Sequence, residues 1–146
     1  MKANELMVGD WISYIEDGKP YFARVSEVYK SSVFTEDGYF EGREVEENEI
    51  IPVPITPRIL EKNDIHETHT NQWVWERKPH TNTDIMYQAD VICFDKEFPR
   101  MENGGLHIGG FVHVASEHGM VYGECEYVHE LQHALKLCRI EKEIKL

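Results

Sequence analysis

The stretch that decides the fold is DWISYIEDGKPYFARV, residues 10–25. Residues 10–15 are rich in aromatic and β-branched side chains, which are typical of a β-strand. Asp17-Gly18 follows, and this dipeptide favours the two-residue turn of a β-hairpin. A second strand is expected over residues 21–29. The stretch therefore predicts a β-hairpin near the start of the chain.

Short strands and glycine-containing turns continue to residue 55. Further strands are expected at residues 33–35, 39–41 and 50–55, with a second turn at Asp37-Gly38. Four or five short strands within about fifty residues are typical of a small barrel, so residues 1–55 are predicted to form an SH3-like or Tudor-like β-barrel. Pro52 and Pro54 lack the amide proton that a central strand needs, which predicts an edge strand and a boundary.

A short helical connector is predicted over residues 56–66. Thr56 is a good N-cap, and Pro57 suits the first helical position. Asn63-Asp64 is expected to end this helix after one or two turns.

Residues 67–146 are predicted to form a mixed β-sheet that carries one helix. Strand patterns occur at residues 73–77, 85–94, 106–115 and 120–122, with an exposed, turn-rich loop at 98–105. The helix is expected over residues 126–139, because its apolar positions keep helical spacing: Tyr127, Val128, Leu131, Ala134, Leu135 and Cys138. Residues 140–146 are expected to add an edge strand. The predicted class is α+β: an N-terminal SH3-like small β-barrel, then a mixed sheet with one amphipathic C-terminal helix.

The composition limits the classes of function. The chain has 146 residues, a formal net charge of −12, 41% hydrophobic and 11% aromatic residues, so it is expected to fold rather than remain disordered. No apolar run approaches the roughly 20 residues of a membrane-spanning helix, and the first residues lack the apolar stretch of a signal peptide. The acidic surplus repels phosphates, so no direct nucleic-acid binding is expected.

The three cysteines are Cys93, Cys125 and Cys138, an odd number without a C-x-x-C pair. This usage favours reduced thiols in the cytoplasm. Cys93 and Cys138 are interpreted as small core residues, and no cysteine has an evident basic neighbour that would lower its pKa.

Residues 129–133 spell H-E-x-x-H on the predicted helix. In zincin peptidases this spacing lets two imidazoles bind Zn²⁺ while the glutamate acts as general base, which would make His129 and His133 the ligands and Glu130 the base. With His129 at 0° on a helical wheel, His133 lies near 40°, whereas the apolar stripe lies between about 140° and 240°. The two imidazoles are therefore expected to point outward into water.

A third zinc ligand is not evident. Lys136 and Arg139 stand where the extended metzincin motif needs glycine and histidine. An upstream ligand, His107 or His113, remains open. We interpret the motif as a polar helix face, with a catalytic zinc site and a non-catalytic metal contact as alternatives.

Other clusters have plainer interpretations. The stretch His66-Glu67-Thr68-His69 is expected to be a solvated loop rather than a metal clip. The aromatic residues of the first part are interpreted as barrel interior rather than as a cage for a cationic side chain: Trp11, Tyr14, Tyr21, Phe22, Tyr29, Phe34, Tyr39 and Phe40. The acidic run is interpreted as a solvated face, with mimicry of DNA phosphates as the alternative: Glu41, Glu44, Glu46, Glu47 and Glu49.

Three stretches form an ordered set, namely MKANEL at residues 1–6, PITPRILEK at 54–62 and YVHELQ at 127–132. The set resembles a group of short, uncharacterised proteins of gut bacteria and of their phages and mobile elements. In that group the late motif commonly has Gln and Asn where this chain has Glu130 and His133. The resemblance implies that His129, Leu131 and Gln132 belong to a shared structural helix, and it implies an intracellular, phage-related setting without supplying an activity.

The sequence thus favours a non-enzymatic, cytoplasmic protein-interaction module that uses no cofactor and has a protein as its partner. The first alternative is a zinc-dependent hydrolase that uses His129, Glu130 and His133. The second is an acidic, DNA-mimicking inhibitor of a nucleic-acid-binding protein.

Overall fold

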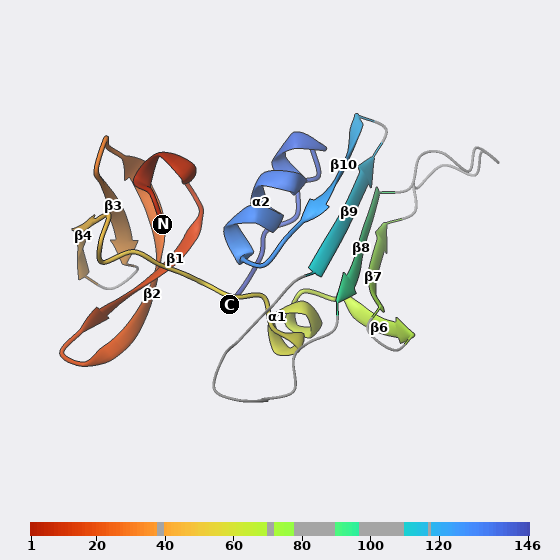
Figure 1. The fold of residues 1–146 in the computed structure, drawn as a ribbon, viewed down its shortest axis with the longest axis horizontal. Helices are drawn as coiled ribbons and strands as arrows, with labels where there is room; N and C mark the ends of the chain where they lie inside the picture. The colour runs from red at the N-terminus through yellow and green to blue at the C-terminus, as the bar shows by residue number, and fades with distance from the viewer. Residues whose placement is uncertain (38–39, 70–71, 78–89, 97–109, 117) are drawn as a thin grey trace. The chain divides into compact units, whose positions relative to one another are not determined.

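The structure is a computed structural model that describes residues 1–37, 40–69, 72–77, 90–96, 110–116 and 118–146. Contacts between Cα atoms divide the chain into two compact units. Unit 1 comprises Met1–Pro54 and Tyr127–His129, and unit 2 comprises Ile55–Glu126 and Glu130–Leu146. The described elements are antiparallel sheets with one main helix, so the predicted α+β class is confirmed (Figure 1).

Unit 1 contains a short 3-10 helix, η1 (Ala3–Glu5), and a sheet whose described strands lie in the order β4-β3-β2-β1-β5. These are β1 (Trp11–Glu16), β2 (Lys19–Val28), β3 (Ser32–Asp37), β4 (Phe40–Glu46) and β5 (Ile51–Pro52). The predicted hairpin is confirmed, because Glu16 pairs with Lys19 across a two-residue loop. Asp17 and Gly18 in this loop have φ angles of 49° and 73°, and positive φ at both positions is what a type I′ turn requires.

Alternate residues of the first sheet face its core. Ile12, Tyr14, Ala23 and Val25 are almost fully buried, together with Val33 and Val45 from the neighbouring strands. Ala3, Leu6 and Ile50 belong to the same buried cluster and cover this inner face. Residues of the opposite parity, such as Ser13 and Phe22, therefore lie on the outer face.

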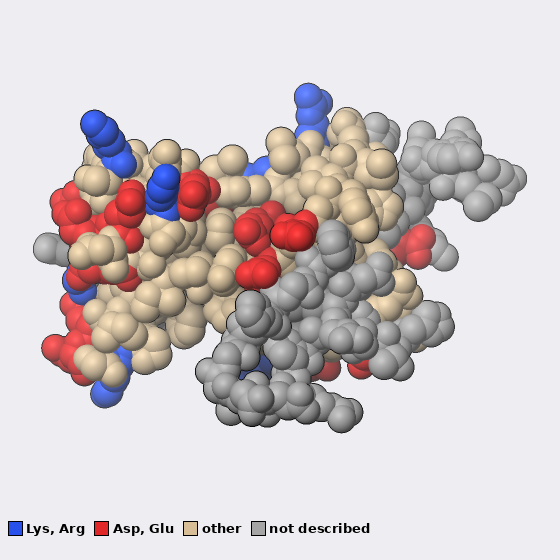
Figure 2. All heavy atoms as spheres, viewed as in Figure 1, with Lys and Arg blue, Asp and Glu red and all other residues tan. Residues whose placement is uncertain are grey.

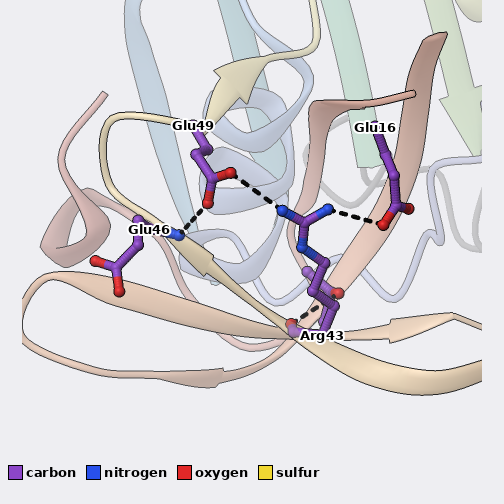
Figure 3. A network of polar contacts seen from close by, with 5 residues as sticks. Glu16, Arg43, Glu46 and Glu49 are labelled. Carbon is purple, nitrogen blue, oxygen red and sulfur yellow. Dashed lines mark hydrogen bonds and ion pairs between the residues drawn. The ribbon is translucent and has the colours of Figure 1, made fainter. Parts of the chain in front are cut away.

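The first sheet is open among the described residues, because β4 and β5 are its edges and do not pair with each other. A side-chain network nevertheless joins β4 to β1 (Figure 3). The Arg43 guanidinium lies 3.1 Å from a carboxylate oxygen of Glu16 and 3.1 Å from one of Glu49, and it stacks 5.0 Å above the Tyr14 ring. Since β2 and β3 separate these strands in the sheet, the network requires the sheet to curl.

One detail of the first part differs from expectation. β4 extends to Glu46, into the acidic stretch that was expected to follow the strand. This is consistent with the register, in which Val45 faces the core opposite Val33 while Glu44 and Glu46 face outward. As predicted, the run containing Pro52 supplies an edge strand, β5, which pairs with β1.

Unit 2 contains the second sheet, with the described strands in the order β10-β9-β8-β7-β6. They are β6 (His66–His69), β7 (Gln72–Arg77), β8 (Asp90–Lys96), β9 (Gly110–Ser116) and β10 (Gly119–Glu124). Each described pair is antiparallel, so the prediction of a mixed sheet is wrong in this respect. The expected loop at residues 66–69 is also wrong, because these residues pair with β7 as an exposed edge strand.

Helix α1 (Pro57–Lys62) begins as predicted, with the Thr56 hydroxyl accepting a hydrogen bond from the Ile59 amide. The C-terminal residues form no strand, contrary to expectation. Instead, the buried Asn63 side chain donates to the Lys145 carbonyl and accepts from the Lys145 amide, both at 2.8 Å. The amide of Asn63 thus supplies the partners that a neighbouring strand would otherwise provide.

Helix α2 (Val128–Leu137) packs on the face of the second sheet that carries Val112, Val114 and Ile92 (Figure 1). The Cys138 thiol, just beyond the helix, donates to the Val114 carbonyl at 3.4 Å. The predicted apolar stripe is confirmed at its centre, because Leu131, Ala134, Leu135 and Cys138 are buried.

Some expected features lie outside the described residues. These are the loop at residues 98–105, the turn residue Gly38, and parts of the strands expected at 39–41, 85–94 and 106–115. The division into separate domains at 1–55, 56–66 and 67–146 stays a prediction. In the structure α1 belongs to unit 2, and only the first two residues of α2, Val128 and His129, are grouped with unit 1.

Candidate functional site

The H-E-x-x-H residues lie on α2, but His129 does not point into water as expected. Its side chain is only 6% exposed, whereas His133 is half-buried. The Tyr127 ring stacks on the His129 imidazole with centroids 5.9 Å apart. Tyr127 also forms an isolated bridge with Pro54, and the Val128 amide donates to the Val53 carbonyl at 2.9 Å. The start of the helix thus also contacts the chain at residues 53 and 54. A helical wheel does not include such contacts.

The Glu130 carboxylate has a structural role. Its Oε2 atom accepts a hydrogen bond from the Glu126 amide at 2.7 Å. Backbone amides at and just before the start of a helix have no carbonyl partner within the helix. The Glu130 carboxylate provides a partner for one of them. Its negative charge in the first turn also opposes the positive end of the helix dipole. These contacts give Glu130 a structural role at the start of the helix.

Of the two histidines considered as a third ligand, the one that the structure describes, His113, is not brought to α2. His113 lies on β9 between Val112 and Val114, whose side chains face the helix, so His113 lies on the opposite face of the sheet. His107 is outside the described residues. Among the residues that the structure describes, no three His, Cys, Asp or Glu side chains gather in a metal-binding group.

Cys93 has a neighbour that the sequence did not reveal. It lies on β8 directly opposite His113, and His113 in turn lies opposite Tyr122 on β10. The rings of His113 and Tyr122 meet edge to face with centroids 6.4 Å apart. The interpretation of Cys93 as a core residue without a basic neighbour is therefore wrong, because Cys93 is half-buried beside an imidazole. Cys125 and Cys138 are buried, and Cys138 packs in the core as expected.

The aromatic residues of the first part are mostly not the interior that was expected. Tyr14 is 2% exposed, whereas Phe22 is 51%, Tyr29 46% and Tyr21 39% exposed. The interior consists mainly of aliphatic side chains. The alternative of a cage is also not favoured at Tyr14, since the cation above its ring is Arg43 of the same unit. Tyr39 and the side chain of Phe40 lie outside the described part.

Three exposed apolar side chains, Ile15, Phe22 and Ile51, lie on the outer face of the first sheet, together with the half-buried Trp11. We call Trp11, Ile15, Phe22 and Ile51 the hairpin face, because they surround the β1–β2 hairpin and its neighbour β5. Phe22 and Ile51 both lie opposite Ser13 in the two adjacent ladders. Ile15 is 50% and Ile51 40% exposed, whereas Ser13 at their centre is only 6% exposed. The four apolar side chains thus form a continuous patch around a covered serine.

Carboxylates occupy the other half of the same outer face. We call Glu27, Glu36, Glu44 and Glu46 the acidic strip; the register places Glu27 and Glu44 on either side of Phe34, and Glu36 opposite Arg24. The Ser32 hydroxyl donates to Glu44 at 2.6 Å, and the Tyr29 hydroxyl donates to Glu27 at 2.5 Å. This hydrogen bond to Glu27 raises the pKa of Tyr29 above its usual value. Acidic side chains gather over unit 1 in Figure 2.

The sequence offered a signal for the hairpin face that was interpreted differently. Trp11, Ser13 and Ile15 alternate with Ile12 and Tyr14 along one strand, so large apolar side chains lie on both of its faces. Alternation alone does not tell which face the rest of the chain covers. The structure decides it, because Ala3, Leu6 and Ile50 cover the face that carries Ile12 and Tyr14.

Comparison of the chain with models of protein families, with curated proteins and with solved structures finds no match. No helix within the described ranges is both long enough and apolar enough to cross a membrane.

Proposed function

We propose that the protein is a non-enzymatic interaction module that binds a protein partner through the hairpin face. The observation that carries this proposal is that Ile15, Phe22 and Ile51 are 50%, 51% and 40% exposed on one face of a sheet. Large apolar side chains that are exposed singly are ordinary, but a contiguous group is typical of an interaction surface.

The energetics favour such a surface. Burial of apolar area contributes roughly 25 cal/mol per Å², and aromatic side chains near the centre of an interface contribute most of the binding energy. Phe22 is the aromatic residue of the patch with the largest exposed fraction, and it lies beside the covered Ser13. We expect Phe22 to be the principal contact with the partner.

The proposal includes the finer features expected from the sequence. We infer that unit 1 is a module of the SH3-like type, which is supported by β5 lying beside β1 and by the Arg43 network that curls the sheet. We also infer a cytoplasmic protein, since none of the three cysteines forms a disulfide.

The zinc-hydrolase alternative has no comparable support. Glu130 binds the Glu126 amide, and His129 is buried beside Tyr127. The DNA-mimic alternative uses the acidic strip, but it leaves the adjoining hairpin face without a role. The interaction module is therefore the function that gives the hairpin face a role.

Site-specific photo-crosslinking in cells tests the proposal. A benzophenone amino acid replaces Phe22 in the full chain, and Leu137, an exposed apolar residue of α2, is the matched control position at 67% exposure. We expect a discrete protein adduct from position 22 that is absent from position 137. A further sample carries the photo-reactive residue at Ile15 together with Phe22→Ser, and in it the adduct should weaken strongly.

Equal adduct patterns from positions 22 and 137 would contradict the proposal. Zinc content of protein purified without an affinity tag is the second measurement. Stoichiometric zinc that is lost in His129→Ala would instead support the hydrolase.

A further inference from the structure

We propose that the segment bound by this protein is an amphipathic helix with lysines and arginines along one flank. Its apolar side would lie on the hairpin face and its cationic flank on the acidic strip. This inference rests on the proposed function and specifies the chemistry of the partner at the same site.

The first argument is the arrangement of the two zones on one sheet. The hairpin face occupies β5, β1 and β2, and the acidic strip runs from the end of β2 across β3 to β4. Neighbouring strands lie about 4.8 Å apart, so Glu36, which is opposite Arg24 on β2, lies roughly 10 Å across the sheet from Trp11 on β1. Glu27 and Glu44 lie further along the strands. An α-helix with its side chains has a diameter of about 10–12 Å, so a helix on the apolar zone reaches the near end of the acidic strip with one flank.

The second argument concerns backbone hydrogen bonds. In the described ladders β2 pairs with β1 along the hairpin, β5 pairs with β1 at Ile12 and Ser13, and β3 pairs with β2 from Arg24 to Val28. At the positions paired on both sides, the amide and carbonyl groups bind one another within the sheet. The outer face at these positions therefore offers side chains to a partner. An extended peptide lying there would bury backbone groups without partners, which costs free energy, whereas a helix binds its own backbone groups internally. The face thus favours a helix over an extended segment.

The third argument is charge. Four glutamates lie on this outer face, whereas Arg24 is the one basic residue that the described register places on it. The Arg24 guanidinium stacks 4.7 Å above the Trp11 ring, and Arg24 lies opposite Glu36, so it stands at the boundary between the apolar zone and the strip. The whole chain carries a formal charge of −12. These charges attract a cationic flank and repel nucleic-acid phosphates, so the complementary occupant is a basic protein segment.

Binding of a defined peptide to the full-length protein tests the inference. The probe is a fluorescein-labelled peptide of about 18 residues, long enough to form a helix, with leucines at helical spacing and lysines along one flank. One control peptide has glutamate in place of each lysine, and another has serine in place of each leucine.

Fluorescence anisotropy gives the dissociation constant, and stopped flow gives the association rate. We expect the lysine peptide to bind at least tenfold more tightly than either control, and its affinity to fall with added salt.

Two variants locate the binding site. Phe22→Ser should weaken binding of the lysine peptide about tenfold or more. The double variant Glu36→Lys with Glu46→Lys should weaken it by about tenfold, mainly through a slower association rate. The matched control is Glu61→Lys with Glu141→Lys, which changes the net charge equally at exposed positions of unit 2. This control should lower the affinity much less. Circular dichroism of each variant checks that the fold is retained.

The outcomes separate this inference from the proposed function. Equal affinity for the lysine and glutamate peptides, equal losses in the two double variants, or no binding of the lysine peptide would overturn the cationic helix. A position-22 adduct in the crosslinking experiment would then still support the interaction module. If Phe22→Ser leaves peptide binding unchanged, the hairpin face is not where the peptide binds, and the inference fails. If the position-22 adduct is also absent, the proposed function fails with it.

Discussion

The described strands form two antiparallel sheets of five strands each, and the helix-covered face of the second sheet contrasts with the exposed hairpin face of the first. In the second sheet, α2 covers Val112 and Val114, and both side chains are at most 3% exposed. In the first sheet, Phe22 and Ile15 are about half exposed. Apolar surface that a helix of the same unit covers already contributes to folding, whereas the hairpin face still has its burial energy available for binding.

The first sheet does not need its outer face in order to fold. Its inner face buries the aliphatic cluster around Ile12, Val25 and Val33 under Ala3, Leu6 and Ile50. We therefore infer that the inner face of this sheet provides stability and its outer face provides recognition. Four substitutions test the contrast between covered and uncovered parts of the molecule, and they are ordered by the expected change in the free energy of unfolding.

The largest effect is expected on the covered face. Leu131 of α2 is fully buried, so Leu131→Ala should lower the free energy of unfolding by about 2–5 kcal/mol through lost burial and a residual cavity. Urea denaturation followed by circular dichroism measures this change. Leu137→Ala is the control on the same helix, at 67% exposure, and should change stability by no more than about 0.5 kcal/mol. Similar losses in both variants would show that α2 does not cover the second sheet.

A smaller effect is expected where the C-terminal residues attach to unit 2. Asn63→Ala leaves the Lys145 amide and carbonyl without their partners and removes the bond to the Ile59 carbonyl. Loss of buried hydrogen bonds of this kind costs about 1–3 kcal/mol. Hydrogen exchange of the Lys145 amide should accelerate accordingly. Asn63→Asp keeps the acceptor for this amide and should protect it better than alanine does; equal exchange in both variants would contradict the contact.

These features differ in how far the sequence could predict them. The β1–β2 hairpin follows from Asp17-Gly18 between two strand-forming runs, and the start of α1 follows from Thr56 and Pro57, because turn and cap preferences are local. The contact between Asn63 and Lys145 joins residues 82 positions apart. No local preference encodes such a pairing, so the C-terminal residues were expected to form a strand.

The candidate site shows the same limit. The apolar stripe around Leu131 and Leu135 was predictable, because helical spacing is a property of neighbouring residues. The burial of His129 was not, since it depends on the chain near Pro54 that bridges to Tyr127. The pairing of Cys93 with His113 likewise depends on the register between β8 and β9. Contacts between elements, rather than patterns within one element, decided each of these differences.

In the first sheet, Arg43 provides the next test. Arg43→Ala removes ion pairs to Glu16 and Glu49 and the stacking on Tyr14. Partly exposed ion pairs and a cation–π contact are each worth up to about 1 kcal/mol, so a loss of about 1–2 kcal/mol is expected in urea denaturation. Arg43→Lys should recover part of it. A loss below about 0.3 kcal/mol in Arg43→Ala would show that the network does not hold β4 near β1.

The smallest effect on stability is expected on the uncovered face. Phe22→Ser removes an aromatic ring that is 51% exposed on the outer face, so the free energy of unfolding should change by no more than about 0.5 kcal/mol. The same urea denaturation measures it, and Val25→Ala on the inner face of the same strand, where Val25 is 1% exposed, is the control that should cost clearly more. A loss in Phe22→Ser as large as that in Val25→Ala would mean that the ring is needed for folding. The hairpin face would then not be a binding surface, because apolar area that is already buried in the folded chain cannot be buried again against a partner.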